Sequence, residues 1–177
     1  QRSHGPMRVR DSGPDATEPY LERARRLAPD SSLVIRTTGN WHFNNGRADE
    51  AIANYRRAIE INANDAATYR SLGRVLFRQA RYDDAIEPLR TAVRLDPFSG
   101  LGSVWLADAS WAVGRAEEAL FRLRRIIEDR PDFAQAHDRL ATYLAQTGET
   151  GLAMRHIIRA RELAPDSARR WFRVCEF

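Results

Sequence analysis

Apolar side chains recur at helical spacing in two consecutive blocks of the stretch 66–99. In the first block Leu72 and Leu76 fall on one face of a helix, and in the second block Ala85 and Leu89 do the same. A short break without this periodicity separates the two blocks. The pattern therefore predicts two α-helices that pack against each other as a hairpin.

The same pattern recurs every 34 residues through four units with no insertion between them. The units span residues 32–65, 66–99, 100–133 and 134–167. Three columns carry mostly small residues and a fourth carries mostly proline: Gly39, Gly73, Ala107 and Ala141; Ala51, Ala85, Ala119 and Ala153; Ala58, Ala92, Ile126 and Ala160; Ala63, Pro97, Pro131 and Pro165. Two helices approach closely only where side chains are short, and a leucine there would cost roughly 1–3 kcal/mol by overpacking. The recurrence indicates four copies of one helical hairpin.

These residues and this period resemble the tetratricopeptide repeat. The Leu-Gly signature of its first helix is met by Leu72-Gly73, and the acidic start of its second helix is met in three units, by Asp49-Glu50-Ala51, Asp83-Asp84-Ala85 and Glu117-Glu118-Ala119. The fourth unit has Gly151-Leu152-Ala153 at this position and is the most divergent. The resemblance implies an all-α fold, a right-handed α-solenoid of four 34-residue helix-turn-helix repeats.

Further segments flank the four repeats. Residues 17–31 have Tyr20 and Leu21 within a helical pattern, so we interpret them as the second helix of a half repeat that covers the N-terminal end of the array. The aromatic-rich residues 168–177 continue the register, either as a C-terminal capping helix or as the start of a further repeat, and they offer a surface for self-association. Residues 1–16 have no periodic pattern, and we expect a disordered segment that begins with a remnant of an expression tag.

The turn inside each unit has a characteristic residue. Gly46, Gly114 and Gly148 occupy this place in three units, and Ala80 occupies it in the second unit. A helix that ends in a left-handed residue favours glycine there, so the sequence predicts a positive φ at the three glycines.

Charge and cysteine content restrict the classes of partner and compartment. The 28 basic residues are all arginine and nearly balance 24 acidic residues, which leaves a formal charge of +4 without a cluster of one sign. A single cysteine, Cys175, excludes an intrachain disulfide, so we expect a cytoplasmic protein, with the periplasm as the alternative. No apolar run is long enough to cross a bilayer, so we expect no membrane insertion.

The residue types that carry catalysis do not form a recognisable pattern. No two of the histidines His4, His42, His137 and His156 have the spacing of metal ligands, and none pairs in sequence with Cys175. His42 and His137 fall in columns that hold apolar residues in other units, which predicts packed histidines with satisfied rings. We therefore expect no catalytic site, no metal, no cofactor and no enzymatic activity.

The first helix of each unit carries a second stripe, beside its core stripe, at positions i, i+4, i+7 and i+8. In the tetratricopeptide family this stripe lines the concave groove that holds extended peptides, so the resemblance implies a groove here. The candidate groove residues are Arg36, Asn40, Phe43, Asn44, Arg70, Arg74, Phe77, Arg78, Asp108, Trp111, Asp138 and Thr142. Arginine binds carboxylates through two parallel hydrogen bonds, and the aromatic rings could receive apolar side chains. In the alternative interpretation the three aromatics pack between neighbouring first helices, and the arginines are solvated.

From this groove we predict that the protein is a non-catalytic scaffold or adaptor. Its ligand would be an acidic and apolar segment of a partner protein. Arg36 and Asn40 resemble the first part of the clamp by which some tetratricopeptide domains hold the C-terminal carboxylate of chaperones. Ser71, Leu101 and Trp105 depart from that clamp, so we do not transfer the chaperone function. The alternative is a regulatory or self-assembly segment of a larger bacterial signalling protein, with homo-oligomers formed through the terminal helices. RNA binding is not expected, because no column repeats one base-reading residue type.

Overall fold

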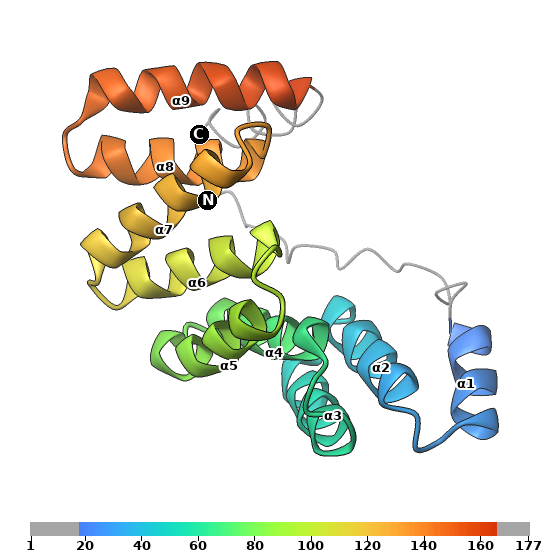
Figure 1. Cartoon of the computed structure of the whole chain (residues 1–177). Coiled ribbons are helices and arrows are strands. Elements are labelled where there is room, and N and C mark those ends of the chain that lie inside the picture. Colours follow the sequence, from blue (N-terminus) through green and yellow to red (C-terminus); the bar gives the residue numbers. More distant parts are fainter. Residues whose placement is uncertain (1–17, 166–177) are drawn as a thin grey trace, which may run out of the picture.

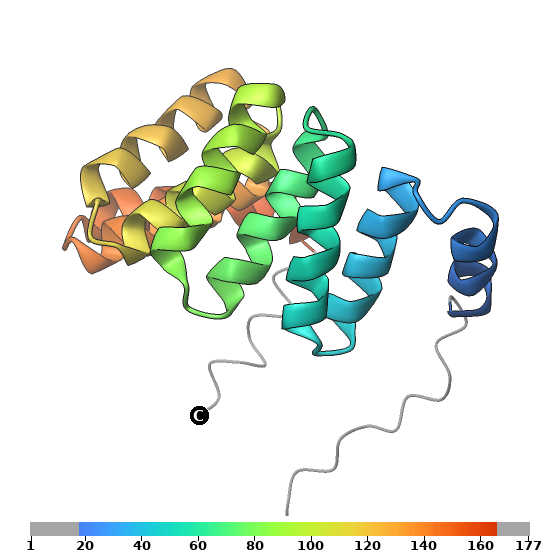
Figure 2. The same ribbon diagram turned by 90° about the horizontal axis from the view of Figure 1, so that it is seen from below.

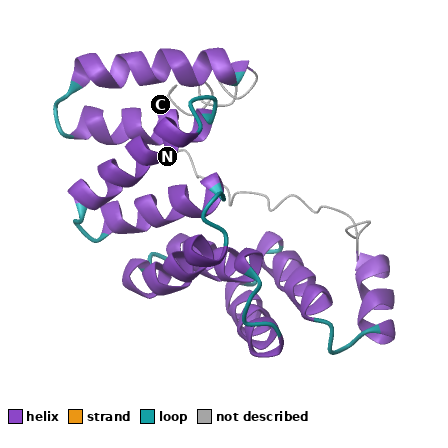
Figure 3. Cartoon of the chain, viewed as in Figure 1, coloured by secondary structure: helices purple, strands orange, loops and turns teal. Residues whose placement is uncertain are grey.

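The computed structural model describes residues 18–165, and all regular secondary structure within this range is α-helical (Figure 3). The helices are α1 (Glu18–Leu27), α2 (Ser32–Asn44), α3 (Ala48–Ile61), α4 (Ala66–Arg78), α5 (Tyr82–Leu95), α6 (Gly100–Ala112), α7 (Ala116–Asp129), α8 (Ala134–Gln146) and α9 (Thr150–Leu163). Helix α1 lies within the predicted half repeat. The predicted disordered segment 1–16 and the predicted helix 168–177 lie outside the described residues.

The helices after α1 form four consecutive hairpins that stack into a curved array (Figures 1 and 2). Within the described residues, the first helices of neighbouring hairpins contact each other, in the pairs α2 with α4, α4 with α6, and α6 with α8. The second helices α3, α5, α7 and α9 make no such contact with one another in this part of the chain. The array therefore curves with the first helices on its inner face, and the predicted α-solenoid of helical hairpins is confirmed.

The small columns lie at the closest approaches of the hairpins. Ala51, Ala85 and Ala119 are completely buried. A Cβ atom on Gly73 would lie 2.7 Å from Leu89 Cδ2, and one on Gly39 would lie 2.7 Å from the Tyr55 ring. These distances are too short for a methyl group, which explains why glycine occupies this column opposite a large partner in the first two repeats.

The turns within the hairpins have left-handed residues in all four repeats. Gly46, Gly114 and Gly148 have φ angles of +75°, +81° and +88°, which confirms the prediction for the three glycines. Ala80 adopts φ 58° at the equivalent place, although an alanine there is strained by its Cβ. The turn that follows each first helix thus keeps one conformation, with or without glycine.

Acidic residues and polar caps fix where several helices begin. Helices α3, α5 and α7 have two acidic residues each in their first turn, where carboxylates interact favourably with the positive end of the helix dipole. The Asp65 side chain caps α4 by accepting a hydrogen bond from the Ala67 amide at 3.0 Å. These local signals therefore fix the starts of three second helices and of α4.

Candidate functional site

The predicted groove residues lie on the four first helices, α2, α4, α6 and α8, which line the inner face of the array (Figure 1). These helices lie side by side, but their groove side chains differ in whether they are accessible to a ligand. Some side chains of the stripe remain available to a ligand, and others are used in contacts within the molecule.

Helix α4 presents three arginines in one stripe along the inner face. Arg70 and Arg74 are half-buried and Arg78 is exposed. Arg70 Nη1 donates to the Ser99 hydroxyl at 3.3 Å, and the Arg74 guanidinium lies 4.7 Å from the centre of the Phe43 ring. Among the described residues, no carboxylate lies within 4.0 Å of any of the three guanidinium groups.

Arg74 has an unused hydrogen-bond donor in the floor of this stripe. Its Nε atom is buried and has no hydrogen-bond partner within the described part of the chain. The Tyr55 hydroxyl lies close by, and burial raises the pKa of Tyr55 while the Arg74 charge partly opposes this rise. A buried guanidinium donor without a partner is costly. The Nε atom is enclosed by protein, so a ligand can reach Arg74 only through the other guanidinium nitrogens.

The residues that resemble the start of the chaperone clamp are engaged within the molecule. Arg36 Nε lies 3.3 Å from Asp65 Oδ2, although the angle does not make a hydrogen bond. Asn40 Oδ1 accepts a hydrogen bond of 2.8 Å from the Tyr55 hydroxyl, and Asn44 is exposed at the end of α2. The cationic character of the groove therefore comes from α4 more than from α2.

The aromatic residues of the stripe are half-buried; Phe43 packs on Arg74, and Phe77 and Trp111 pack on other rings. Phe77 lies 5.1 Å from Tyr82 and 5.5 Å from Trp105, measured between ring centres. Trp111 stacks on Tyr143 at 4.1 Å with an interplanar angle of 3°. Each ring thus contributes to packing between helices, as the alternative interpretation expects, while part of its surface stays exposed on the inner face.

Asp108 is the centre of a buried polar cluster under the second half of the groove. It is 3% exposed, accepts a hydrogen bond of 2.5 Å from the Tyr143 hydroxyl, and pairs with Arg139 Nε at 3.1 Å. Burial raises the pKa of Asp108, and the Arg139 charge opposes this rise. Burial and, to a smaller extent, the adjacent Asp108 carboxylate also raise the pKa of Tyr143. Asp108 therefore holds α6 to α8 and is out of reach of a bound segment.

The last helix of the inner face adds a weakly acidic end. Asp138 is half-buried and Thr142 is exposed, with the Thr142 hydroxyl donating to the Asp138 carbonyl oxygen at 3.0 Å. Burial raises the pKa of Asp138, and Arg139 partly opposes this. The groove is therefore cationic on α4, neutral on α6 and weakly acidic on α8.

Sequence reasoning missed several partners of the groove residues. Asp65, Arg139 and Tyr143 lie outside the predicted stripe, although each contacts a member of it. The columns of Arg139 and Tyr143 change residue type from repeat to repeat, so the period gave no signal for these two residues. Asp65 shares its column with Ser31 and Ser99, which marks it as a helix cap but not as a partner of Arg36.

Two predictions about histidines have different outcomes. Both ring nitrogens of His137 have partners, one of them His156, so its ring is satisfied. The prediction of a satisfied ring is wrong for His42, because its buried Nδ1 atom has no hydrogen-bond partner.

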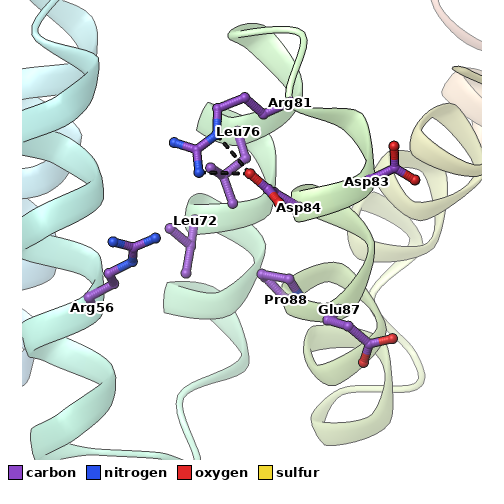
Figure 4. Close-up of a pocket in the computed structure, with 8 residues that line it drawn as sticks. All are labelled: Arg56, Leu72, Leu76, Arg81, Asp83, Asp84, Glu87 and Pro88. Carbon is purple, nitrogen blue, oxygen red and sulfur yellow. Dashed lines mark hydrogen bonds and ion pairs between the residues drawn. The ribbon is translucent and has the colours of Figure 1, made fainter. Parts of the chain in front are cut away.

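A pocket of about 430 Å³ lies on the other side of the molecule, between the second helices α3 and α5. Figure 4 shows Leu72 and Leu76 between Arg56 of α3 and Pro88 of α5, with Arg81 paired to Asp84. None of the predicted groove residues lines this pocket. It follows from the curvature of the array, which separates neighbouring second helices.

Comparison with known proteins agrees with this architecture. A family model described as "TPR repeat" matches residues 39–80. A comparison with curated protein sequences gives no match. None of the described helices is long and apolar enough to span a membrane.

Several solved structures share the fold at low sequence identity. MamA (41-end) from Desulfovibrio magneticus RS-1 is 18% identical, with a TM-score of 0.71 over 82% of this chain and 82% of that chain. YrrB, titled a TPR protein with an unusual peptide-binding site, is 20% identical, with a TM-score of 0.67 over 84% and 76%. The first TPR of Spaghetti (RPAP3), bound to the HSP90 peptide SRMEEVD, is 23% identical, with a TM-score of 0.63 over 67% and 94%. The family model therefore identifies a tetratricopeptide repeat within residues 39–80, and the solved structures share the fold of the array of hairpins.

Proposed function

We propose that the chain is a non-catalytic scaffold that binds an extended segment of a partner protein along its inner face. The observation that carries this proposal is the stripe of Arg70, Arg74 and Arg78 on α4, which has no carboxylate partner among the described residues. Half-buried guanidinium groups are stabilised by acceptors, and a carboxylate fits two of their donors at once. An acidic side chain of the partner is the ligand that this stripe favours.

The neighbouring aromatic surfaces add an apolar element to the expected ligand. The Phe43 ring of α2 lies under the Arg74 guanidinium, and Phe77, on the same helix as Arg74, is half-exposed. An apolar side chain next to the acidic residue would cover both rings and exclude water from the arginines, which strengthens the charged hydrogen bonds. The groove on α6 offers Trp111 but no accessible carboxylate, because Asp108 is buried.

Two structural neighbours support binding of peptides by this architecture. YrrB is described as having a peptide-binding site, and the RPAP3 domain was solved with an HSP90 peptide whose sequence includes two glutamates and an aspartate. Their identity to this chain is low, so the ligand of this chain is inferred from its own arginines. We infer a different register from that of the chaperone clamp, since Arg36 and Asn40 are already engaged.

Charge reversal tests the proposal directly. We expect Arg70→Glu with Arg74→Glu to reduce capture of the partner from a lysate of the source cells by at least about tenfold, since each arginine–carboxylate hydrogen bond contributes about 1.5–3 kcal/mol. The measurement is quantitative mass spectrometry of proteins retained by the immobilised wild-type and variant chains.

A matched variant separates the two faces of the array. Arg56→Glu with Arg94→Glu makes the same charge change at exposed positions of α3 and α5, and should retain the partner. The thermal midpoints of both variants establish that they are folded. Equal loss in both variants, or loss in the outer-face variant alone, would rule out the inner-face stripe as the site.

A further inference from the structure

Two histidines of the last hairpin meet near the start of α8, on the side away from the turn that joins α8 to α9. His137 of α8 and His156 of α9 have their Nδ1 atoms 2.9 Å apart, and His137 Nε2 lies 3.1 Å from the Pro131 carbonyl oxygen. Because a carbonyl oxygen can only accept, His137 Nε2 carries the proton and its Nδ1 presents a lone pair. The single proton between the two rings therefore belongs to His156 Nδ1.

This arrangement matches the way proteins prepare histidine for metal binding. A metal-bound imidazole usually donates its remaining N–H to a carbonyl or carboxylate oxygen, which fixes the tautomer and the orientation of the ring. His137 already has this bond, and its ring is held in place because it is only 6% exposed. His156 is half-buried, so the pair has one fixed ring and one that water can reach.

We propose that His137 and His156 form a binding site for a transition-metal ion such as Zn²⁺ or Ni²⁺, held by the two Nδ1 atoms and completed by water. On binding, the proton of His156 Nδ1 moves through solvent to its Nε2, so both imidazoles stay neutral. Zinc–nitrogen bonds of about 2.0–2.1 Å at a tetrahedral angle place two nitrogens about 3.3 Å apart. The ring centres are 5.1 Å apart, so the two Nδ1 atoms face each other almost head-on in their present hydrogen bond. The partly exposed His156 ring therefore has to turn away from His137 before both Nδ1 atoms can reach one ion.

The surroundings set a limit on the affinity of this site. Among residues 18–165, no three histidine, cysteine, aspartate or glutamate side chains converge, so the protein supplies two ligands there. The positive charge of Arg124 acts on His156 electrostatically. The same Arg124 charge disfavours a cation, so we expect binding weaker than at four-ligand structural zinc sites.

The test measures metal-dependent stability in a chain from which His4 and Cys175 are removed. His4→Gln and Cys175→Ser form the background, because both residues lie outside the described part and could bind the ion independently. ZnCl₂ or NiCl₂ at ten times the dissociation constant should raise the thermal midpoint by about 3–6 °C. His156→Gln should abolish this rise; its equivalents in the other repeats are Asn54, Pro88 and Arg122, so this position tolerates other side chains.

A control and a spectroscopic measurement complete the design. His42→Gln removes a histidine outside the pair and should keep the metal-dependent rise. Nitrogen-15 NMR of the histidine rings should show Nδ1 of both His137 and His156 shifting on metal addition. No rise in the midpoint up to millimolar metal, or a rise that persists in His156→Gln, would overturn the proposal.

Discussion

At the scale of single residues, a comparison of equivalent positions in the repeats identifies polar side chains at positions that hold buried apolar residues in other repeats. His42 occupies a column that holds Leu76 and Leu144 in other repeats, and both leucines are buried. The His42 ring packs edge-on against Trp41, and its buried Nδ1 has no partner. Burial, together with the Arg47 charge, lowers the pKa of His42. The residue therefore costs stability that an apolar side chain would restore.

Replacement of His42 by leucine should stabilise the chain. We expect His42→Leu to raise the free energy of unfolding by about 1 kcal/mol at pH 7, since it removes an unsatisfied buried donor or acceptor. The folded pKa lies below the unfolded value of 6.5, so the unfolded state binds more protons as the pH falls through 6.5. The gain from the substitution should therefore be larger at pH 5 than at pH 7. Urea unfolding at both pH values measures it, and an equal gain at both would contradict this explanation.

At the scale of helices, the stability of each hairpin depends on close approach at one column. Gly73 of α4 faces Leu89 of α5, which is fully buried, and a Cβ there would lie 2.7 Å from Leu89 Cδ2. Gly151 of α9 has no neighbouring atom within 4 Å of such a Cβ. The same substitution should therefore have opposite effects at the two glycines.

Alanine substitutions at these two positions measure the value of close packing. Gly73→Ala should lower the free energy of unfolding by about 1–3 kcal/mol through overpacking against Leu89. Gly151→Ala should raise it by roughly 0.5–1 kcal/mol, because alanine is the better helix former and meets no steric conflict. Chemical denaturation of both variants measures these changes in the free energy of unfolding. A stabilising Gly73→Ala would show that α4 and α5 adjust their distance freely.

The helices could be predicted from the sequence because their signals are local. Turn glycines, paired acids at helix starts and small columns all act within one hairpin, and the structure places the helices accordingly. Which groove side chains are accessible to a ligand could not be predicted in the same way. Asp108 is buried by Tyr143 from the next repeat, and Arg36 is paired with Asp65 beyond its own hairpin. Such contacts depend on how repeats stack, which the 34-residue period does not encode.

At the scale of the whole molecule, curvature determines which surface can bind a segment. The first helices contact their neighbours along the inner face, whereas the second helices separate and leave the outer pocket beside Arg56. The inner face brings the arginines of α4, which have no carboxylate partner among residues 18–165, together with half-buried rings. We therefore expect a partner segment to cross α4 on the inner side, with its acidic residue near Arg74.

Site-specific photo-crosslinking tests this central claim most directly. A benzoylphenylalanine at position 78 places the probe at the exposed end of the arginine stripe, and one at position 121 places it on an exposed residue of α7. After irradiation in the source cells, mass spectrometry identifies the crosslinked peptide. Our account predicts a partner peptide with acidic residues attached to position 78 and none at position 121. A partner attached only to position 121 would contradict it.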